Sequence, residues 1–126
     1  MHALVIDDAK SMRLILKSFL RQLGFSAAEA GDGRAGLEEL ARAGRPDVVF
    51  VDCFMPEMDG YEFLRALRAD PRYAGLPVVM ASAGEGAADQ VLALASGADA
   101  FLQKPFTRDA VQAKLGQFGL AAGAAP

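Results

Sequence analysis

Residues 48–60 read VVFVDCFMPEMDG and carry the most informative pattern in the chain. Four apolar residues in succession, without the alternation of a half-exposed strand, predict a strand covered on both faces. Asp52 closes this strand, and the Pro-Glu-Met-Asp-Gly segment after it is rich in turn-forming residues. Leu64 and Leu67 then follow helical spacing. The stretch therefore predicts one unit made of a buried strand, an acidic strand end, a loop and a helix.

The same unit recurs on both sides of this stretch. Five short apolar, β-prone runs occur at residues 4–6, 25–28, 48–51, 78–80 and 100–102. The segments between them show helical spacing, most clearly at residues 12–23, which end before Gly24, and further at residues 37–41, 64–67, 91–95 and 111–118. Strands that alternate with helices predict an α/β fold of the doubly wound (βα)5 kind. We expect a three-layer sandwich around a five-stranded parallel sheet.

Composition limits the class of protein. A length of 126 residues fits one domain, and 52% hydrophobic residues are too many for a disordered chain. The net charge of −3 provides no basic surface for nucleic acid, so we expect no direct nucleic-acid partner. One cysteine, Cys53, excludes a disulfide framework. No apolar run approaches a membrane span and no signal peptide opens the chain, so we expect a cytoplasmic protein without membrane insertion.

Aspartates stand at the ends of two predicted strands. Asp7 and Asp8 follow the first strand, and Asp52 closes the third. Ligands of open α/β sheets bind beyond the carboxyl ends of the strands, so these carboxylates converge if the two strands are neighbours. Such a cluster is unfavourable unless it is protonated or neutralised by a cation, and oxygen ligands with water suit Mg²⁺. The alternative is that each Asp only caps the next helix or forms a turn.

Two further polar residues are expected at the same edge. Ser82 ends the fourth strand and Lys104 follows the fifth. A hydroxyl, an ammonium group and a metal ion are suited to hold the oxygens of a phosphoryl group in transfer. Asp52 would then act as a nucleophile and form an aspartyl phosphate. The alternative, if each residue is considered alone, is that Ser82 is a turn residue and Lys104 a solvated charge.

These residues resemble the receiver domain of bacterial response regulators, in particular its single-domain chemotaxis-type members. The resemblance covers residues 2–118 and rests on Asp7-Asp8, on Asp52 with the Met55–Gly60 segment that follows, on Ser82-Ala83 and on Lys104-Pro105-Phe106. It implies a flavodoxin-like sheet of order 2-1-3-4-5. We assign residues 1–118 to the receiver domain and residues 119–126 to a Gly/Ala tail, which we expect to be disordered.

The resemblance also implies a role for each matching residue. Asp52 is the expected phosphoacceptor. Asp8 and Asp52 are the expected direct Mg²⁺ ligands, together with the backbone carbonyl of Phe54, while Asp7 acts largely through water.

The residues expected to respond to the phosphoryl group lie on the last two strands. Ser82 and Lys104 are expected to hold this group, Phe101 takes the position of the aromatic switch residue, and the Lys104–Pro105 bond is expected to be cis. Ser82 stands where threonine is commoner, so its χ1 is less restricted. Phe101 replaces a tyrosine and donates no hydrogen bond, so coupling through it must rest on packing.

Two positions near the expected phosphoacceptor also depart from members of the family with polar residues there. Phe54 and Gly84 offer no side-chain group to orient a hydrolytic water. We therefore predict a slow loss of phosphate from Asp52.

The expected function is that of a phosphorelay switch. A histidine kinase donates the phosphoryl group, and the face formed by residues 91–95, 100–102 and 111–118 then changes shape and binds a target protein. We expect output in chemotaxis or motility, a monomer or a phosphorylation-dependent dimer, and no enzymatic turnover beyond the protein's own phosphorylation and dephosphorylation. The alternatives are a receiver domain from a hybrid kinase or a multidomain regulator, and a docking or dimerisation module that works without phosphorylation.

Two rivals from other classes share parts of this pattern. An aspartate-dependent phosphohydrolase needs a second Asp two residues after its nucleophile, where this chain has Phe54. A flavin-binding module needs an uncharged, hydroxyl-rich phosphate loop after the first strand, where Asp7 and Asp8 would repel a phosphate.

Overall fold

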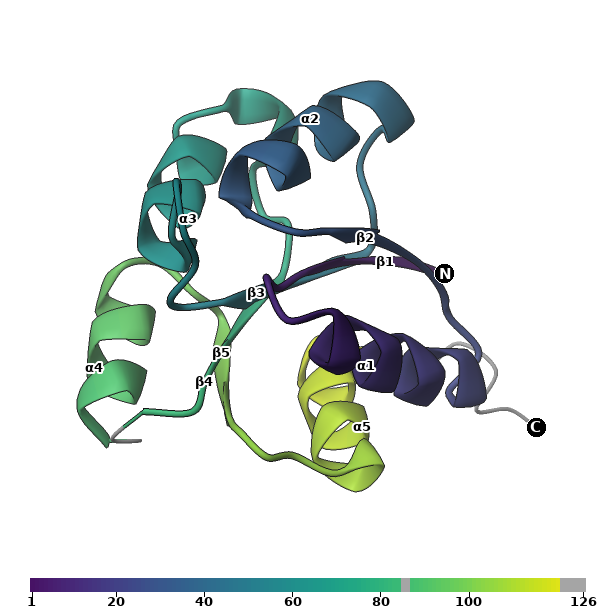
Figure 1. Ribbon diagram of the computed structural model, residues 1–126. Helices are drawn as coiled ribbons and strands as arrows, with labels where there is room; N and C mark the ends of the chain where they lie inside the picture. The colour runs from purple at the N-terminus through teal and green to yellow at the C-terminus, as the bar shows by residue number, and fades with distance from the viewer. Residues whose placement is uncertain (85–86, 121–126) are drawn as a thin grey trace.

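The computed structural model describes residues 1–84 and 87–120 and forms one parallel sheet with helices on both faces (Figure 1). The strands lie in the order β2-β1-β3-β4-β5. This order confirms the expected flavodoxin-like topology. The elements are β1 (His2–Ile6), α1 (Lys10–Gln22), β2 (Ser26–Ala30), α2 (Gly33–Ala43), β3 (Val48–Asp52), α3 (Gly60–Arg68), a 3-10 turn (Pro71–Tyr73), β4 (Val78–Ser82), α4 (Ala87–Ala95), β5 (Ala100–Gln103) and α5 (Arg108–Gln117).

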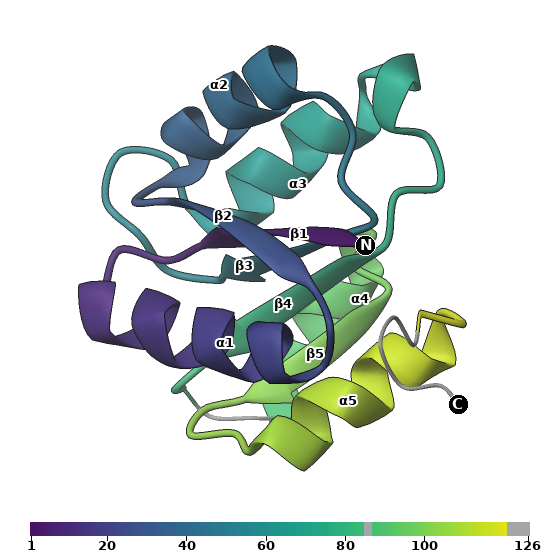
Figure 2. The same cartoon turned by 90° about the vertical axis from the view of Figure 1, so that its right-hand side faces the viewer.

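Two hydrophobic cores lie on opposite faces of the sheet. In one core, α2, α3 and α4 pack on alternate strand residues such as Ile6, Val51 and Met80. In the other, α1 and α5 pack on the intervening residues such as Val5 and Phe50. Figure 2 shows the sheet between these two layers of helices. Every residue of β3 and β4 is buried, which explains why these strands lack apolar–polar alternation.

The helix boundaries follow local signals in the sequence. Asp32 accepts from the Ala35 N–H at 2.7 Å at the start of α2, and Thr107 accepts from the Ala110 N–H at 3.1 Å at the start of α5. Asp59 and Glu62 form a reciprocal capping box at the start of α3. The acidic residue Asp59 thus has a structural role, whereas Asp7, Asp8 and Asp52 provide no side-chain cap to the helices α1 and α3 that follow them.

Gly60 brings α3 close to the end of β3. A Cβ at this position would overlap the backbone carbonyl oxygen of Asp52 and lie 2.8 Å from Met80 Cε. The absent side chain therefore allows the first turn of α3 to pack directly on Asp52 and fixes the path of the loop between them.

The helix α4 forms where the apolar spacing predicted a helix, but the residues that gave this signal are not the ones it buries. The apolar residues Val91 and Leu92, which indicated the helix, are 69% and 51% exposed, and Ala93 is the fully buried residue. A small residue at the contact allows α4 to lie close to the sheet, while its larger apolar side chains face outward.

After α5, Gly119 adopts a positive φ of 72° and the Leu120 N–H donates to the Leu115 carbonyl at 2.9 Å. Leu120 packs on the core beneath α1 and α5. The rest of the predicted tail, residues 121–126, lies outside the described residues. Among the helices of the described chain, none is long and apolar enough to cross a membrane.

Candidate functional site

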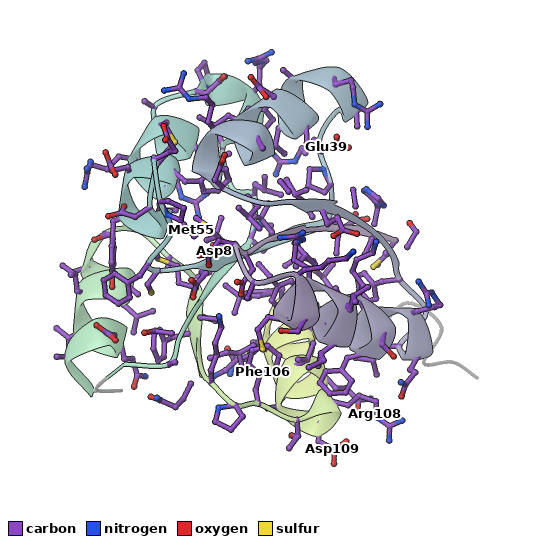
Figure 3. The ribbon with its side chains drawn as sticks, in the orientation of Figure 1. Asp8, Glu39, Met55, Phe106, Arg108 and Asp109 are labelled. Carbon is purple, nitrogen blue, oxygen red and sulfur yellow. The ribbon has the colours of Figure 1, made fainter. Side chains whose placement is uncertain are left out.

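The carboxyl ends of β1 and β3 bring three aspartates together. Ile6 pairs with Val51 in the register of these strands, so the residues after them, Asp7 and Asp52, are neighbours. Asp7, Asp8 and Asp52 each offer a carboxylate oxygen, and these atoms lie within 4.8 Å of one another. Asp7 and Asp52 are buried, whereas Asp8, which is labelled in Figure 3, is exposed. The convergence predicted from the strand ends is present.

Lys104 joins this cluster from the loop after β5. Its Nζ donates to Asp7 Oδ2 at 2.7 Å and lies 3.0 Å from Asp52 Oδ1. Its side chain is only 13% exposed, so water screens these contacts weakly. We call Asp7, Asp8, Asp52 and Lys104 the acidic site. One ammonium group faces three carboxylates there, which leaves an excess of negative charge.

Asp7 is held in place by backbone contacts and by Arg13. The Asp7 Oδ1 accepts from the Ala9 N–H at 2.9 Å, and the Asp7 carbonyl accepts from Arg13 Nη1 at 2.6 Å. Arg13 also pairs with Glu29 on β2 at 2.7 Å. The sequence analysis did not identify Arg13 as a supporting residue. Its side chain occupies a helical position three residues into α1, where no periodic signal distinguishes it from a solvated charge.

Burial and the neighbouring charges shift the pKa values of Asp52 and Lys104. Dehydration of the Asp52 carboxylate raises its pKa above the ordinary value, and this outweighs the stabilising contact with Lys104. Burial alone would lower the pKa of Lys104, but its bonds to Asp7 and Asp52 raise it overall. Lys104 therefore stays protonated, and Asp52 is held as an anion less readily than an exposed aspartate.

The donor set of the acidic site fits a small, hard cation. The three clustered groups are all carboxylates, and excess negative charge at close range is relieved by a divalent ion. Receiver domains generally bind Mg²⁺ at such an acidic pocket. In this chain, Asp7, Asp8 and Asp52 are the side chains that would hold it.

Ser82 lies at the same edge, but its hydroxyl faces another partner. Ser82 is the last residue of β4, and its carbonyl accepts from the backbone N–H of Lys104, just after β5, at 2.8 Å. Ser82 is fully buried, and its Oγ donates to Asp89 Oδ2 on α4 at 2.7 Å. The sequence analysis did not identify Asp89, because it stands alone in an alanine-rich helix and only the fold brings it to Ser82.

The remaining predicted positions surround the site. Phe101 is 7% exposed and packs in the core beneath α2, α3 and α4. Phe54 is 56% exposed, and its ring meets Tyr61 edge-to-face at a centroid distance of 6.1 Å. The Lys104–Pro105 peptide bond is cis, as the resemblance implied.

Strand order and acidic site together define the class: a flavodoxin-like α/β domain with its site at the carboxyl edge of the sheet. Residues 3–116 match the family model of the response regulator receiver domain. The chain therefore belongs to this family, and its similarities identify it as a CheY-like member.

Three similar proteins support this assignment. The chemotaxis protein CheY of Pseudomonas aeruginosa is 42% identical over 117 residues, which are 91% of this chain and 93% of that protein. The DNA-binding response regulator MtrA of Mycobacterium tuberculosis is 44% identical over 82% of this chain, but the match spans only 43% of MtrA. The structure of chemotaxis protein CheY4 of Vibrio cholerae has a TM-score of 0.84 at 30% identity and covers 92% of this chain and 96% of that chain.

Proposed function

We propose that this chain is a phosphorylation switch in which Asp52 accepts a phosphoryl group from a histidine kinase. The observation that supports this most strongly is the bridging position of Lys104 between Asp7 and Asp52. A lysine so placed neutralises part of the acidic site while leaving carboxylate oxygens for an incoming group. The Asp52 oxygen forms a bond to phosphorus, the phosphorus–nitrogen bond of the phosphohistidine breaks, and the released imidazole nitrogen takes a proton.

The neighbouring residues have separate parts in this transfer. Mg²⁺, when bound, supplies the positive charge that offsets repulsion between the acidic site and the phosphoryl oxygens. Asp8 and Asp52 would bind it directly together with the Phe54 carbonyl, and Asp7 would act largely through water. Lys104 stays protonated and holds one phosphoryl oxygen, and the Ser82 hydroxyl holds another. We expect the protein to act as a switch, with no enzymatic turnover beyond its own phosphorylation and dephosphorylation.

The output follows from the position of Ser82. Ser82, Phe101 and α4 share one face of the sheet, so a change at the phosphoryl group reaches the surface formed by α4, β5 and α5. This surface carries the exposed apolar residues Val91, Leu92 and Leu94. A target protein that binds one form of this surface shifts the population toward that form.

Chemotaxis or motility is the output that the relatives favour. The match to P. aeruginosa CheY spans nearly the whole of both chains, and the V. cholerae neighbour is also a chemotaxis protein. The match to MtrA supports the alternative of a receiver domain within a longer regulator. A docking module without phosphorylation would have no use for the retained acidic site.

The proposal is tested by incubating the protein with purified, radiolabelled histidine kinases in the presence of Mg²⁺. We expect label to pass from at least one kinase to the wild-type chain, and Asp52→Asn to abolish the transfer. The Asp47→Asn variant, changed just before the other end of β3, is the matched control and should accept label normally. Equal labelling of wild type and Asp52→Asn would contradict the proposal.

A further inference from the structure

The hydroxyl proton of Ser82 already takes part in a hydrogen bond to Asp89. Ser82 Oγ donates to Asp89 Oδ2 at 2.7 Å and accepts from the Gly84 N–H at 3.0 Å. A serine hydroxyl has one proton, so the same proton cannot also be donated to a phosphoryl oxygen. An oxygen without an available proton would repel that anion. Ser82 must therefore leave Asp89 before it can hold a phosphoryl group.

The position of Asp89 makes this bond a link to α4. Asp89 lies in the first turn of α4 and is partly buried. Met80, two residues before Ser82 on β4, packs in the core beneath α2, α3 and α4, so strand alternation directs Ser82 to the same side. Among the described residues, Ser82 is the side chain that donates to Asp89. A partly buried carboxylate without this hydrogen bond is unfavourable. We therefore expect the Asp89 side chain to move outward into water when the bond is lost.

Gly84 provides the space in which Asp89 sits. A Cβ at Gly84 would overlap Asp89 Oδ2 and lie 3.2 Å from Ser82 Oγ. The backbone of Gly84 lies outside the left-handed region, so its conformation does not require glycine. The Gly84 carbonyl also accepts from Gln103 Nε2 on β5 at 2.9 Å. Gly84 is therefore bonded directly to β5, and it is linked to α4 through Ser82 while Asp89 holds that hydroxyl.

We propose that Asp89 is a positioning residue that holds the Ser82 hydroxyl on α4 in the unphosphorylated protein, and that the phosphoryl group competes with Asp89 for this hydroxyl. This inference rests on the proposed function, since it requires Ser82 to bind the phosphoryl group. Each phosphorylation breaks the Ser82–Asp89 bond and releases the first turn of α4. By linkage, a partner that binds the released form of α4 strengthens the hold on the phosphoryl group.

The test uses beryllium trifluoride as a probe for the phosphoryl group, titrated into isotope-labelled protein at saturating Mg²⁺ and followed by NMR. We expect Asp89→Ala to bind the probe about tenfold more tightly, because a charge-assisted hydrogen bond no longer competes for Ser82. Asp89→Asn, which keeps an acceptor oxygen without the charge, should lie between wild type and Asp89→Ala. In the probe-free protein, Asp89→Ala should shift the amide resonance of Gly84, whose N–H reports on Ser82 Oγ.

A second variant pair separates hydroxyl competition from simple charge repulsion. In a Ser82→Ala background, Asp89→Ala should have no further effect on probe affinity, whereas removal of a repelling charge would tighten binding there as well. The matched control is Asp109→Ala, which removes an exposed aspartate from the first turn of α5, well away from Asp8 in Figure 3. Its affinity should equal that of the wild type.

The outcomes distinguish this inference from the proposed function. Unchanged affinity in Asp89→Ala, or equal tightening with and without the Ser82 hydroxyl, overturns the role of Asp89 while wild-type binding still supports the switch. A wild-type protein that binds no probe overturns both. Should Asp89→Ala not fold, Gly84→Ala displaces the same carboxylate and must also tighten binding, or the inference fails.

Discussion

The amino and carboxyl edges of the sheet hold charged residues in contrasting ways. At the amino end, the Val78 N–H and Arg68 both donate to Asp99 at 2.8 Å, and Arg68 also donates to the carbonyls of Leu76 and Gly97. We call Arg68, Asp99 and these backbone groups the amino-end network. It contains one cation for one anion. At the carboxyl end, the acidic site has one ammonium group for three carboxylates.

This difference shows how the same ion-pair chemistry serves structure at one end and a site at the other. The amino-end network is balanced, and its guanidinium satisfies carbonyls of two loops. The acidic site is unbalanced, and it lies at the edge of the sheet where ligands of such folds bind. An excess of like charge costs stability, so it indicates function more clearly than the mere presence of a salt bridge does.

We expect the largest difference in stability between variants that lack Lys104 and variants that lack Arg68. Lys104→Met removes the cation that the buried carboxylates of Asp7 and Asp52 share, and we expect it to lower the free energy of unfolding by about 3 kcal/mol in metal-free buffer. Arg68→Met should cost about 1 kcal/mol, because Asp99 is 42% exposed and water replaces the guanidinium.

Urea denaturation with EDTA and with Mg²⁺ measures both variants. Added Mg²⁺ should restore most of the loss in Lys104→Met and none in Arg68→Met, since ligand binding to the folded state stabilises it. If both variants lose the same free energy of unfolding and neither responds to Mg²⁺, the acidic site and the amino-end network do not differ in the way described.

A smaller effect is expected when one negative charge is removed from the acidic site. Asp8→Asn should raise the free energy of unfolding by about 1 kcal/mol without Mg²⁺, because it relieves repulsion by Asp7 and Asp52. The same variant should bind Mg²⁺ at least about tenfold more weakly, since it loses a charged oxygen ligand. Asp109→Asn on α5 is the control for an exposed aspartate. If Asp8→Asn is destabilising in EDTA, the acidic site carries no excess repulsion.

The pH dependence of stability should also differ between wild type and Asp52→Asn. The pKa of Asp52 is raised in the folded protein by burial, so between its unfolded and folded pKa values the folded state binds more protons. In metal-free buffer, wild-type stability should therefore fall as the pH rises through this window, relative to Asp52→Asn. Parallel stability curves for the two proteins would show that Asp52 titrates as an ordinary aspartate.

The smallest expected effect concerns access of water. Phe54 is 56% exposed beside the acidic site, whereas Tyr73 near the amino end is 5% exposed. Phe54→Asn introduces an amide that can orient a water molecule toward the phosphoryl group, and we expect phosphate loss about threefold faster. Phe54→Ala controls for removal of the ring and should change the rate less. A rate in Phe54→Asn no higher than in Phe54→Ala would refute a water-orienting role for this position.

Much of this arrangement could be predicted from the sequence, because parallel buried strands leave long apolar runs and their ends carry the site. The runs before Asp52 and Ser82 located β3 and β4, and the aspartates at strand ends located the acidic site. The strand order came from family resemblance, since periodicity says nothing about which strands are neighbours.

The contacts that the sequence did not indicate depend on tertiary structure. Asp89 meets Ser82 only because α4 folds back over β4, and seven residues of separation carry no recognisable signal. The sequence also did not indicate which face of α4 is exposed. Val91 and Leu92 resemble core residues in a helical pattern, and yet they are exposed. A pattern of apolar residues predicts a helix more reliably than it predicts which side of that helix is buried.

The central claim is that Asp52 becomes phosphorylated at a site assembled by Asp7, Asp8 and Lys104. Incubation with acetyl phosphate tests this without any kinase, with intact-protein mass spectrometry as the readout. We predict that the wild-type chain gains one phosphoryl group in Mg²⁺ and none in EDTA, and that Asp52→Asn gains none in either buffer. A wild-type chain that stays unmodified in Mg²⁺, or an Asp52→Asn variant that gains the same mass, would contradict the account.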